Sequence, residues 1–543
     1  MMFVMSWEGT TSSTLPDDVE ALKSIILGKD THIAELERQN QFLVEQVTIL
    51  QKYRFARSSE KWIEEDRKQQ WIFDEAEAGF QEKSGESEEV ERISYTRKKR
   101  KGRRPIPEHL PRTVITHELT EAQRRCPLPD CSQRGQCKKL RPVIGEDYRE
   151  ELEFIPAQII VKRHVYKKYG QIPCETFEQD ERVPMVVGAE RERRIIPRGI
   201  VTASLLSYIA VSKFADGLPL YRQERILARI GIRISRQSMS NWIIQGARAC
   251  GKYLELFWTR IREGPLINMD ETPLQVLHEP GRPAERKSFM WVMVGTGADG
   301  KRIVLYAYSQ RRNAETAESL LEGYEGALQT DAFSGYRIVA ERKRLWHVGC
   351  MFHSRRKFYE AHIGAKKQGH AQEGLKYIQR LYRIEEELRK EQLADEEFVD
   401  KRRRAAAPVF REFKGWLIKM SLTVPPRSLL GNAITYTLNE YQRLVRYLRY
   451  AYLTPDNNVA ENGLRPFVVG RKAWLFNNTP LGAHASAGMY SMIETAKANN
   501  LDPFHFMYRL FERLPEADTP EKLEKLLPWN MTGIPPYRRN GEI

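Results

Sequence analysis

Three acidic residues that lie far apart in the chain could together hold a metal ion. Asp270 interrupts the apolar run PLINMDETPLQV and Asp331 follows the apolar segment ALQT, so each is expected where a buried strand ends. A buried carboxylate is costly unless it binds something, although ordinary turns at strand ends also use aspartate. Glu461 is expected in the first two turns of a helix that follows a proline and three capping residues. Because Mg²⁺ prefers carboxylate oxygens, with water and substrate phosphate completing its shell, an Asp-Asp-Glu set that folding brings together predicts a site for Mg²⁺ or Mn²⁺.

The expected helix with Glu461 also carries a dense run of cationic and aromatic side chains. These are Arg465, Arg471, Lys472 and Trp474. A carboxylate beside such a run favours a metal site that meets a nucleic-acid backbone. The alternative is a capped surface helix whose charges are solvated. Asp456 is a second candidate for the third acid, but its position before the helix suits a cap better.

A second basic segment, HVGCMFHSRRKFYE, is expected to run from a strand into a helix. It contributes His353, Arg355 and Arg356 as further candidates for DNA contact. A helix that carries solvated charge explains these residues as well.

The segments around the three acids predict an α/β catalytic domain over 260–505. SFMWVMVGTGADGKRIVLYAYS indicates two strands joined at a Gly-Ala-Asp-Gly turn, and ETAESLLEGY indicates a helix. From about 361 to 450 the pattern is amphipathic or largely apolar with a helical period. A helical insertion there would explain why Glu461 lies 461 − 331 = 130 positions after Asp331. Residues 506–543 form a C-terminal tail.

A helix-turn-helix region is predicted over 195–250. The pattern indicates a helix from Leu220 to Arg229, a turn at Gly231, and a second helix capped by Ser235. The exposed face of that second helix predicts contacts with DNA through Arg236, Gln237, Ser240 and Asn241. The alternative is an ordinary helical hairpin in which Trp242 and Ile243 are packing residues.

Four cysteines mark a small region over 119–185. They are Cys126, Cys131, Cys137 and Cys174. Between them, EELEFIPAQIIVKRHVYKKYG alternates in a way that suggests two strands. Two thiolate clusters bridged by a hairpin are typical of a zinc ribbon, and four thiolates could close a tetrahedral Zn²⁺ site. The spacing is irregular, however, so a metal-free remnant of such a fold is the alternative.

The N-terminal segment 15–80 begins with heptads over 22–50. The a positions are Ile26, Ile33, Asn40 and Val47, and the d positions are Leu22, Lys29, Leu36, Leu43 and Leu50. This pattern favours a parallel two-stranded coiled coil, with a single amphipathic helix as the alternative. A charged linker over 81–118 follows, and its basic block RKKRKGRR is either an arm on DNA phosphates or a solvated tether.

Composition narrows the class of protein. The chain has 543 residues, a formal net charge of +15, and only six cysteines. The length predicts several domains, and the charge favours a polyanionic partner. No apolar run approaches the ~20 residues of a membrane span, and the first residues do not resemble a signal peptide. A reducing cytoplasm is expected, with no disulfide scaffold.

Five stretches of the sequence resemble the transposases of the insertion sequence 66 family. They are NMDETPLQV, LQTDAFSGY, HVGCMFHSRRKFYE, DNNVAENGLRPFVVGRKAWLF and SMIETAKANNLDP. The resemblance extends over nearly the whole chain. It implies an α/β, ribonuclease-H-like catalytic core with a helical insertion, an Asp-Asp-Glu triad at Asp270, Asp331 and Glu461, and a mobile-element setting with small accessory proteins. Two departures are Gln171, where the family's second cysteine pair usually begins, and Gly463, which replaces a better helix former.

The sequence therefore predicts a bacterial, cytoplasmic and nucleoid-associated transposase that cuts and joins DNA as a homodimer or higher oligomer. The predicted architecture is an N-terminal coiled coil, a small zinc-ribbon-like β region, a helix-turn-helix domain and the catalytic core. Mg²⁺ or Mn²⁺ would serve catalysis, and Zn²⁺ would serve structure. One alternative is a structure-specific nuclease. The other is a transposase-derived DNA-binding regulator without catalysis, and the intact triad argues against this second alternative.

Overall fold

The computed structural model describes residues 159–170, 186–188, 191–197, 199–364 and 369–537, together with scattered positions between 18 and 40. The chain divides into two compact units, one of Met1–Glu60 with Lys168–Tyr537 and one of Lys61–Lys167 with Arg538–Ile543. Every strand and helix named below lies in the first unit. Among the described residues, no helix is both long and apolar enough to cross a bilayer.

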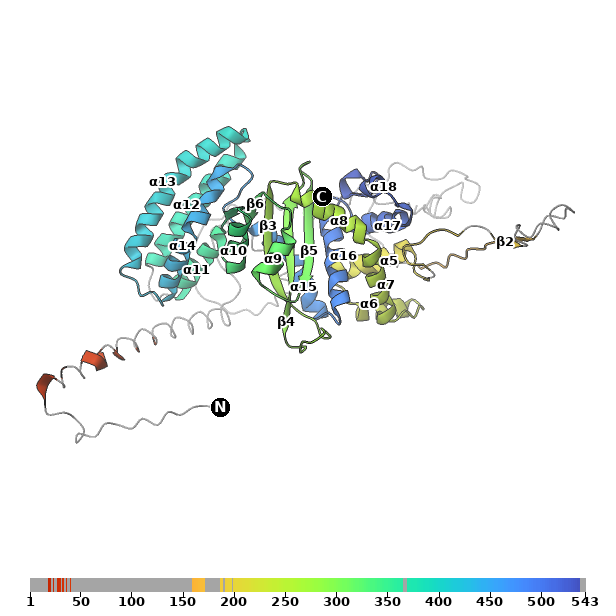
Figure 1. The fold of residues 1–543 in the computed structure, drawn as a ribbon, viewed down its shortest axis with the longest axis horizontal. Coiled ribbons are helices and arrows are strands. Elements are labelled where there is room, and N and C mark those ends of the chain that lie inside the picture. The colour runs from red at the N-terminus through yellow and green to blue at the C-terminus, as the bar shows by residue number, and fades with distance from the viewer. Residues whose placement is uncertain are drawn as a thin grey trace, which may run out of the picture. The chain divides into compact units, whose positions relative to one another are not determined.

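A five-stranded mixed sheet forms the centre of the first unit (Figure 1). Its strands lie in the order β5-β4-β3-β6-β7. The first three are antiparallel neighbours, while β6 and β7 continue the sheet in parallel with β3. Their bounds are β3 Leu266–Gln275, β4 Lys287–Thr296, β5 Arg302–Ser309, β6 Ala327–Gln329 and β7 Trp346–Val348. The two strands expected on either side of the Gly-Ala-Asp-Gly turn are confirmed as β4 and β5.

The register of β3 and β6 explains where the first two acids lie. The parallel pairing ends at Asn268 opposite Gln329. Asp270 and Asp331 each follow two residues later, so both lie beyond the carboxyl end of that pairing. Asp331 comes after its strand, as predicted. The prediction that a strand ends at Asp270 is wrong, because β3 continues through it by antiparallel pairing with β4, where Asp270 lies opposite Val292.

Two helices from the carboxyl-terminal part of the chain cover the sheet. Helix α15, Asn458–Trp474, packs against β3 and β4, and α16, Pro480–Ala498, packs against β5. The hydroxyl groups of Ser491 and Thr495 accept hydrogen bonds from edge-strand N–H groups of β5 at 2.8 and 3.0 Å. Residue 463 lies so close to β4 that a Cβ there would be 2.8 Å from Cγ2 of Val294. The glycine that weakens the helix is therefore what lets α15 approach the sheet.

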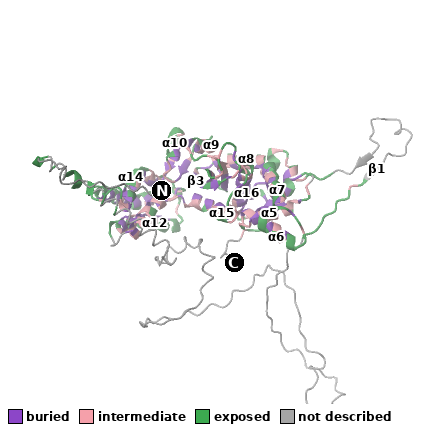
Figure 2. Ribbon diagram, turned by 90° about the horizontal axis from the view of Figure 1, so that it is seen from below, coloured by how far each residue is buried: buried purple, intermediate pink, exposed green. Residues whose placement is uncertain are grey.

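Helices that precede the sheet share its hydrophobic core (Figure 2). They are α5 Ala203–Phe214, α6 Leu220–Arg229, α7 Arg236–Ala249 and α8 Gly251–Arg262. The predicted helix, turn and cap are confirmed, because Gly231 has φ +88° and the Ser235 hydroxyl accepts a hydrogen bond from the N–H of Ser238 at 3.1 Å. Trp242 and Ile243 are buried, as packing residues would be. Helices α17, Pro503–Arg513, and α18, Pro520–Glu524, add residues to the same core.

The helical segment between β7 and α15 builds a core of its own. It consists of α11 Met351–Gly364, α12 His370–Lys390, α13 Asp395–Ser421, α14 Leu429–Val445 and the 3₁₀ helix η2 Arg446–Arg449. Helix α14 packs against β7, and the backbone N–H of Gly349 donates to the carbonyl of Arg443 at 3.1 Å. The helices predicted over about 361–450 are thus present, beginning earlier, at Met351, and they lie beside the central sheet (Figure 1). That they are an insertion into the catalytic core stays a prediction. Two shorter helices lie between strands: α9 Ala314–Leu320 between β5 and β6, and α10 Ser334–Arg342 between β6 and β7.

The N-terminal predictions fall largely outside the described residues. The four cysteines of the predicted zinc site, the basic block and five of the nine heptad positions lie there. The described heptad positions are helical and exposed, and they are Lys29, Ile33, Leu36 and Asn40. Strand β1, Lys168–Gly170, pairs antiparallel with β2, Val186–Gly188. The expectation of two strands before residue 171 is wrong for 159–167, which form no strand. Within the described part of the chain, no strand pairs with residues 159–167, and Val161 is 93% exposed.

Candidate active site

Asp270 and Asp331 lie beyond the carboxyl end of the β3–β6 pairing, and Glu461 lies near them in the first turn of α15. Burial raises the pKa of Asp270 to about 8, and the negative charges of Glu271, Asp331 and Glu461 act in the same direction. Burial likewise raises the pKa of Glu461 to about 7, with repulsion from Asp456 and Asp331 adding to the shift. Such repulsion acts over short distances. The three carboxylates are therefore neighbours, although 461 − 270 = 191 positions separate the outer two, and their joint binding of a metal ion stays a prediction.

A buried amide network fixes the start of α15 against the strand ends. The side-chain N–H of Asn268 donates to Asn457 at 2.9 Å and to Gln329 at 3.2 Å. Asn457 donates in turn to the carbonyl of Met269 at 2.9 Å, and Gln329 donates to the carbonyl of Thr454 at 2.7 Å. The three amide side chains are at most 3% exposed. Because such buried groups are costly to leave unpaired, the network holds Glu461 in place beside Asp270.

Two charged residues that the sequence patterns did not indicate, Glu271 and Arg312, lie next to the acids. Glu271 accepts hydrogen bonds from the guanidinium of Arg312 and the hydroxyl of Tyr336. Arg312 also lies 3.6 Å from Oδ2 of Asp331 and 4.0 Å from the centroid of the Phe333 ring. It thus places a positive charge between Glu271 and an acid of the site. The position of Glu271 next to Asp270 was a signal, but nothing in the sequence pairs it with Arg312.

Asp456 lies where a helix cap is expected. Its Oδ1 accepts a hydrogen bond from the backbone N–H of Asn458 at 3.1 Å. This geometry matches a residue that satisfies a free N–H at the start of a helix. Asn457, at the N-cap position itself, makes no such bond and uses its side chain in the amide network.

The basic and aromatic residues on α15 differ in whether they contact other side chains of the protein. Lys472 is exposed and Arg465 is half-buried. Arg471 is half-buried and donates to the Thr272 hydroxyl at 3.3 Å. Trp474 packs edge-on against the Phe467 ring at 5.5 Å, with the ammonium of Lys213 5.0 Å from its own ring. Packing thus accounts for Trp474 and in part for Arg471, and their contact with DNA stays a prediction.

The other candidates for DNA contact lie on α7 and α11. Arg236, Gln237 and Asn241 are exposed and Ser240 is half-buried. On α11, Arg355 is half-buried, while Arg356 is 65% exposed and pairs with Glu360 at 3.2 Å. These positions leave α7 with a polar exposed face, as a recognition helix needs.

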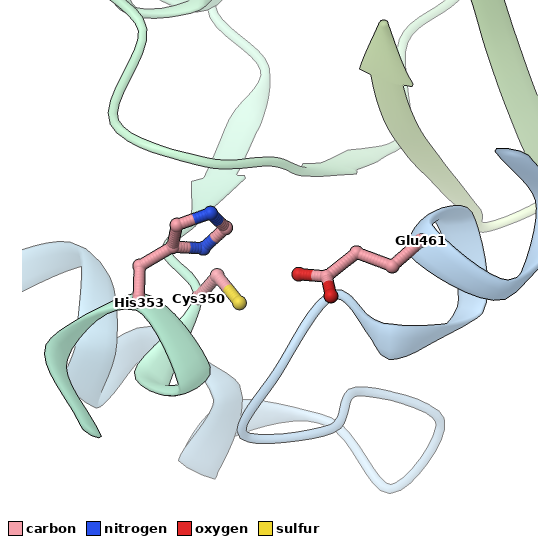
Figure 3. A group of neighbouring side chains, drawn as sticks. All are labelled: Cys350, His353 and Glu461. Carbon is pink, nitrogen blue, oxygen red and sulfur yellow. The ribbon is translucent and has the colours of Figure 1, made fainter. Parts of the chain in front are cut away.

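His353 lies beside Glu461, together with a residue that sequence analysis overlooked. Ligand atoms of Cys350, His353 and Glu461 all lie within 4.8 Å of one another (Figure 3). Nδ1 of His353 and Oε1 of Glu461 are buried and have no hydrogen-bond partner. His353 was predicted to contact DNA, whereas its neighbours are the acids of the site. The Cys-x2-His spacing was the available signal for Cys350.

In metal-free protein, we expect the free energy of unfolding to fall as the pH rises from about 4 to about 8. The folded-state pKa values of Asp270 and Glu461, about 8 and about 7, exceed their ordinary values. The unfolded chain therefore loses these protons first, and each group lowers stability by up to about 1.4 kcal/mol per pH unit in that window. Urea denaturation in chelator at several pH values measures the slope.

A matched pair of variants isolates the contribution of Asp270 to this slope. Asp270→Asn should show a shallower decline than wild type. Asp299→Asn, in the exposed β4–β5 turn, should match wild type. A slope that Asp270→Asn leaves unchanged would show that the pKa of Asp270 is not raised.

Comparison with known proteins finds matches along most of the chain. A family model described as "Transposase IS66 family" matches residues 198–485, and one described as "IS66 C-terminal element" matches 491–529. Models described as "Transposase C of IS166 homeodomain" and "zinc-finger binding domain of transposase IS66" match 43–115 and 129–175. The last range includes Cys131, Cys137 and Cys174 but not Cys126.

Three uncharacterized proteins of Sinorhizobium fredii (strain NBRC 101917 / NGR234) are similar to this chain. The uncharacterized protein y4qI is 29% identical over 95% of this chain and 97% of its own length. The uncharacterized protein y4jD is 30% identical over 78% of this chain and 81% of its own. The uncharacterized protein y4hP is 27% identical over 80% of this chain and 78% of its own.

Proposed function

The chain belongs to the insertion sequence 66 family of transposases, and from this premise we propose that it cleaves and joins DNA at the ends of a mobile element by metal-assisted phosphoryl transfer. The observation that carries the proposal is the placement of Asp270 and Asp331 beyond the carboxyl end of the β3–β6 pairing, with Glu461 near them in the first turn of α15. Burial and the neighbouring negative charges raise the pKa of Asp270 and of Glu461. Crowded, buried carboxylates are unfavourable alone and become favourable when divalent cations bind them. Perturbed carboxylates of this kind are frequent in active sites.

The chemistry assigned to the site follows from its donors. Two divalent ions, when bound, would activate water or a DNA 3′-hydroxyl and stabilise the leaving oxygen. Asp270 and Asp331 would hold or flank both ions, and Glu461 would complete one shell. The amide network fixes the start of α15 to β3, so Glu461 would reach a bound ion without movement of the backbone. Arg312, bound to Glu271, would keep Asp331 oriented.

We also propose that the core is ribonuclease-H-like. Support comes from the sheet, in which three antiparallel strands continue into two parallel ones. Two acids beyond the carboxyl end of the parallel pairing and a third on a later helix fit that type of core. The helices α11 to α14 would then be an insertion between the last strand and the helix of the third acid.

DNA cleavage should require Mg²⁺ or Mn²⁺. The ligands proposed for catalysis are all carboxylate oxygens, which suit these hard cations. We expect cleavage of a labelled element end with Mg²⁺ or Mn²⁺, none in excess chelator, and inhibition by Ca²⁺, whose larger and more flexible shell does not support in-line geometry. Gel analysis of the labelled DNA measures this. Full activity in excess chelator would rule out the metal mechanism.

Two other activities use the same parts of the chain. A structure-specific nuclease would cut element ends without joining them, and a regulator derived from a transposase would bind ends without cutting. A strand-transfer assay with end-bearing DNA and a plasmid target separates the three. Joined product supports the transposase, cut product alone supports the nuclease, and bound but uncut DNA supports the regulator.

We further propose two features of the N-terminal part. One structural zinc ion would be held by Cys126, Cys131, Cys137 and Cys174, which the family match to a zinc-finger region supports for three of the four. A parallel dimer would form through the heptads over 22–50, supported by the exposure of Ile33 and Leu36 in the single chain. A dimer would bring two element ends together, and accessory proteins would act on that assembly.

A further inference from the structure

We propose that Cys350, His353 and Glu461 form a site for a borderline-soft divalent ion such as Zn²⁺, and that an ion bound there stops DNA cleavage. The binding of the ion stands on the geometry of the three side chains. Its effect on cleavage rests on the proposed function, because Glu461 is the acid that both sites would use.

The three side chains come from two segments that are distant in sequence. Cys350 lies in the two-residue connection between β7 and α11, His353 lies in the first turn of α11, and Glu461 lies in the first turn of α15. Figure 3 shows the imidazole, the thiol and the carboxylate directed toward a common space. One ligand atom from each lies within 4.8 Å of the other two. A metal ion between them needs only small side-chain movements to reach bonding distances of about 2.0–2.3 Å.

Two atoms of the cluster lack partners. Nδ1 of His353 and Oε1 of Glu461 are buried and make no hydrogen bond. A buried polar atom without a partner costs about 1–3 kcal/mol. An ion bound to both atoms would remove this cost, because nitrogen and carboxylate oxygen are ordinary ligands of Zn²⁺.

The backbone around Cys350 is already held in place. The N–H of Asn457 donates to Sγ of Cys350 at 3.2 Å. The N–H of Met351 donates to the carbonyl of Pro455 at 2.9 Å, so the start of α11 is fixed to the loop before α15. A hydrogen bond to sulfur stabilises a thiolate and orients it as a ligand. Burial raises the pKa of the Cys350 thiol. Binding of an ion would release the thiol proton to solvent, because a thiol that coordinates a divalent metal is deprotonated.

The donor set selects the ion. One sulfur, one nitrogen and one carboxylate oxygen suit Zn²⁺ and Co²⁺ better than Mg²⁺, which prefers oxygen alone. Three protein ligands leave a fourth position of a tetrahedral ion for water. An ion bound to Cys350 and His353 would draw the Glu461 carboxylate toward itself, and its positive charge would repel a catalytic Mg²⁺ nearby, so we expect the two sites to compete.

Metal counting on the full chain tests the binding. Protein stripped of metal is equilibrated with Zn²⁺, freed of excess, and assayed for zinc by elemental analysis. We expect wild type to hold about one equivalent more than Cys350→Ser or His353→Gln. The cysteines of the zinc-finger region are intact in all these proteins, so the difference reports on the new site alone. Equal zinc content in wild type and both variants would overturn the proposal.

A matched control keeps this result independent of folding. Cys250→Ser removes the other buried free cysteine among the described residues, at the end of α7, and should retain the full zinc content of wild type. With Co²⁺ in place of Zn²⁺, absorption from thiolate-to-cobalt charge transfer should be weaker in Cys350→Ser than in wild type and unchanged in Cys250→Ser. Unchanged absorption in Cys350→Ser would exclude Cys350 as a ligand.

Zinc titration of cleavage in Mg²⁺ tests the effect on the reaction. Each rate is normalised to the zinc-free rate of the same protein. The Zn²⁺ concentration that halves the rate should be at least about tenfold higher for Cys350→Ser than for wild type, a loss of about 1.4 kcal/mol in binding. Equal concentrations for the two would overturn the inhibitory role. If wild type does not cleave DNA at all, the proposed function fails, while the zinc count still decides the site.

Discussion

Replacing Asp270 by Asn should lower the rate of DNA strand cleavage by at least about a thousandfold, or about 4 kcal/mol of transition-state stabilisation. The amide keeps the shape of the side chain but removes the charge that metal coordination needs. Asp331→Asn and Glu461→Gln should have effects of the same size, because all three acids contribute to one site. Single-turnover cleavage of a labelled element end measures the rates.

The chain offers a matched control for this series. Asp456→Asn changes an acid next to the site, but asparagine caps a helix as well as aspartate does. This variant should cleave DNA within a fewfold of wild type, since Asp456 bonds the N–H of Asn458. Retained cleavage in one of the triad variants would remove that residue from the triad. Loss of cleavage in Asp456→Asn would instead point to Asp456 as the third acid.

Folding can be separated from chemistry in the same series. Burial disfavours the charge of Asp270 in the metal-free site. Asp270→Asn should therefore be at least as stable as wild type at neutral pH in chelator, and it should bind element ends with the same affinity. A variant that is inactive, stable and still bound to DNA supports a catalytic role for the charge.

Arg402→Ala should destabilise the helical insertion by about 3–5 kcal/mol. The Arg402 side chain on α13 is fully buried and pairs with Glu385 of α12 at 2.7 Å. It also donates to the carbonyls of Tyr447 and Leu453 at 2.8 and 3.1 Å. Alanine would leave the buried carboxylate of Glu385 with only the partly exposed Arg389 as its cationic partner, and it would remove the Arg402 donor from the carbonyl of Tyr447. The loss of these buried polar contacts, together with the cavity left by the side chain, is the source of the cost. Chemical denaturation followed by circular dichroism measures the change.

Arg404→Ala is the matched control for Arg402→Ala. It removes an arginine from the same helix, but this side chain is 79% exposed and pairs with Asp400 on the surface. Exposed pairs contribute about 0–1 kcal/mol, so this variant should remain close to wild type. A loss below about 1 kcal/mol in Arg402→Ala would mean that the buried pair is replaceable.

Arg402 also bears on the active site. The carbonyl of Leu453 that it binds lies one residue before Thr454, which the amide network connects to Gln329. The segment from Leu453 to Asn458 leads directly to the helix of Glu461. We therefore expect Arg402 to help position Glu461 indirectly, by binding the backbone carbonyl of Leu453 in the segment that leads to α15.

Local signals were sufficient for much of the fold. The helix at Leu220–Arg229, the turn at Gly231 and the cap at Ser235 depend on neighbours in sequence, and the structure confirms them. The strands on either side of the Gly-Ala-Asp-Gly turn follow for the same reason. The grouping of Asp270 with Asp331 and Glu461 required more than local pattern, and the family resemblance supplied it.

Features that depend on distant partners were not predictable. Asp270 lies within β3 because β4 pairs with both halves of that strand, and no property of PLINMDETPLQV indicates where pairing ends. The Glu271–Arg312 pair, and the approach of Glu461 to Cys350 and His353, join segments that are separated in sequence. Trp474 looked like a DNA contact because it follows cations, yet Phe467 and Lys213 pack against it.

The position of Mn²⁺ in a crystal of the full chain bound to an element end shows whether the three acids hold the catalytic metal. Anomalous scattering identifies the metal without any assumption about activity. We expect manganese peaks within bonding distance of the carboxylates of Asp270, Asp331 and Glu461, next to a DNA phosphate. Manganese bound to the DNA or elsewhere on the chain, with no peak at these three acids, would contradict it.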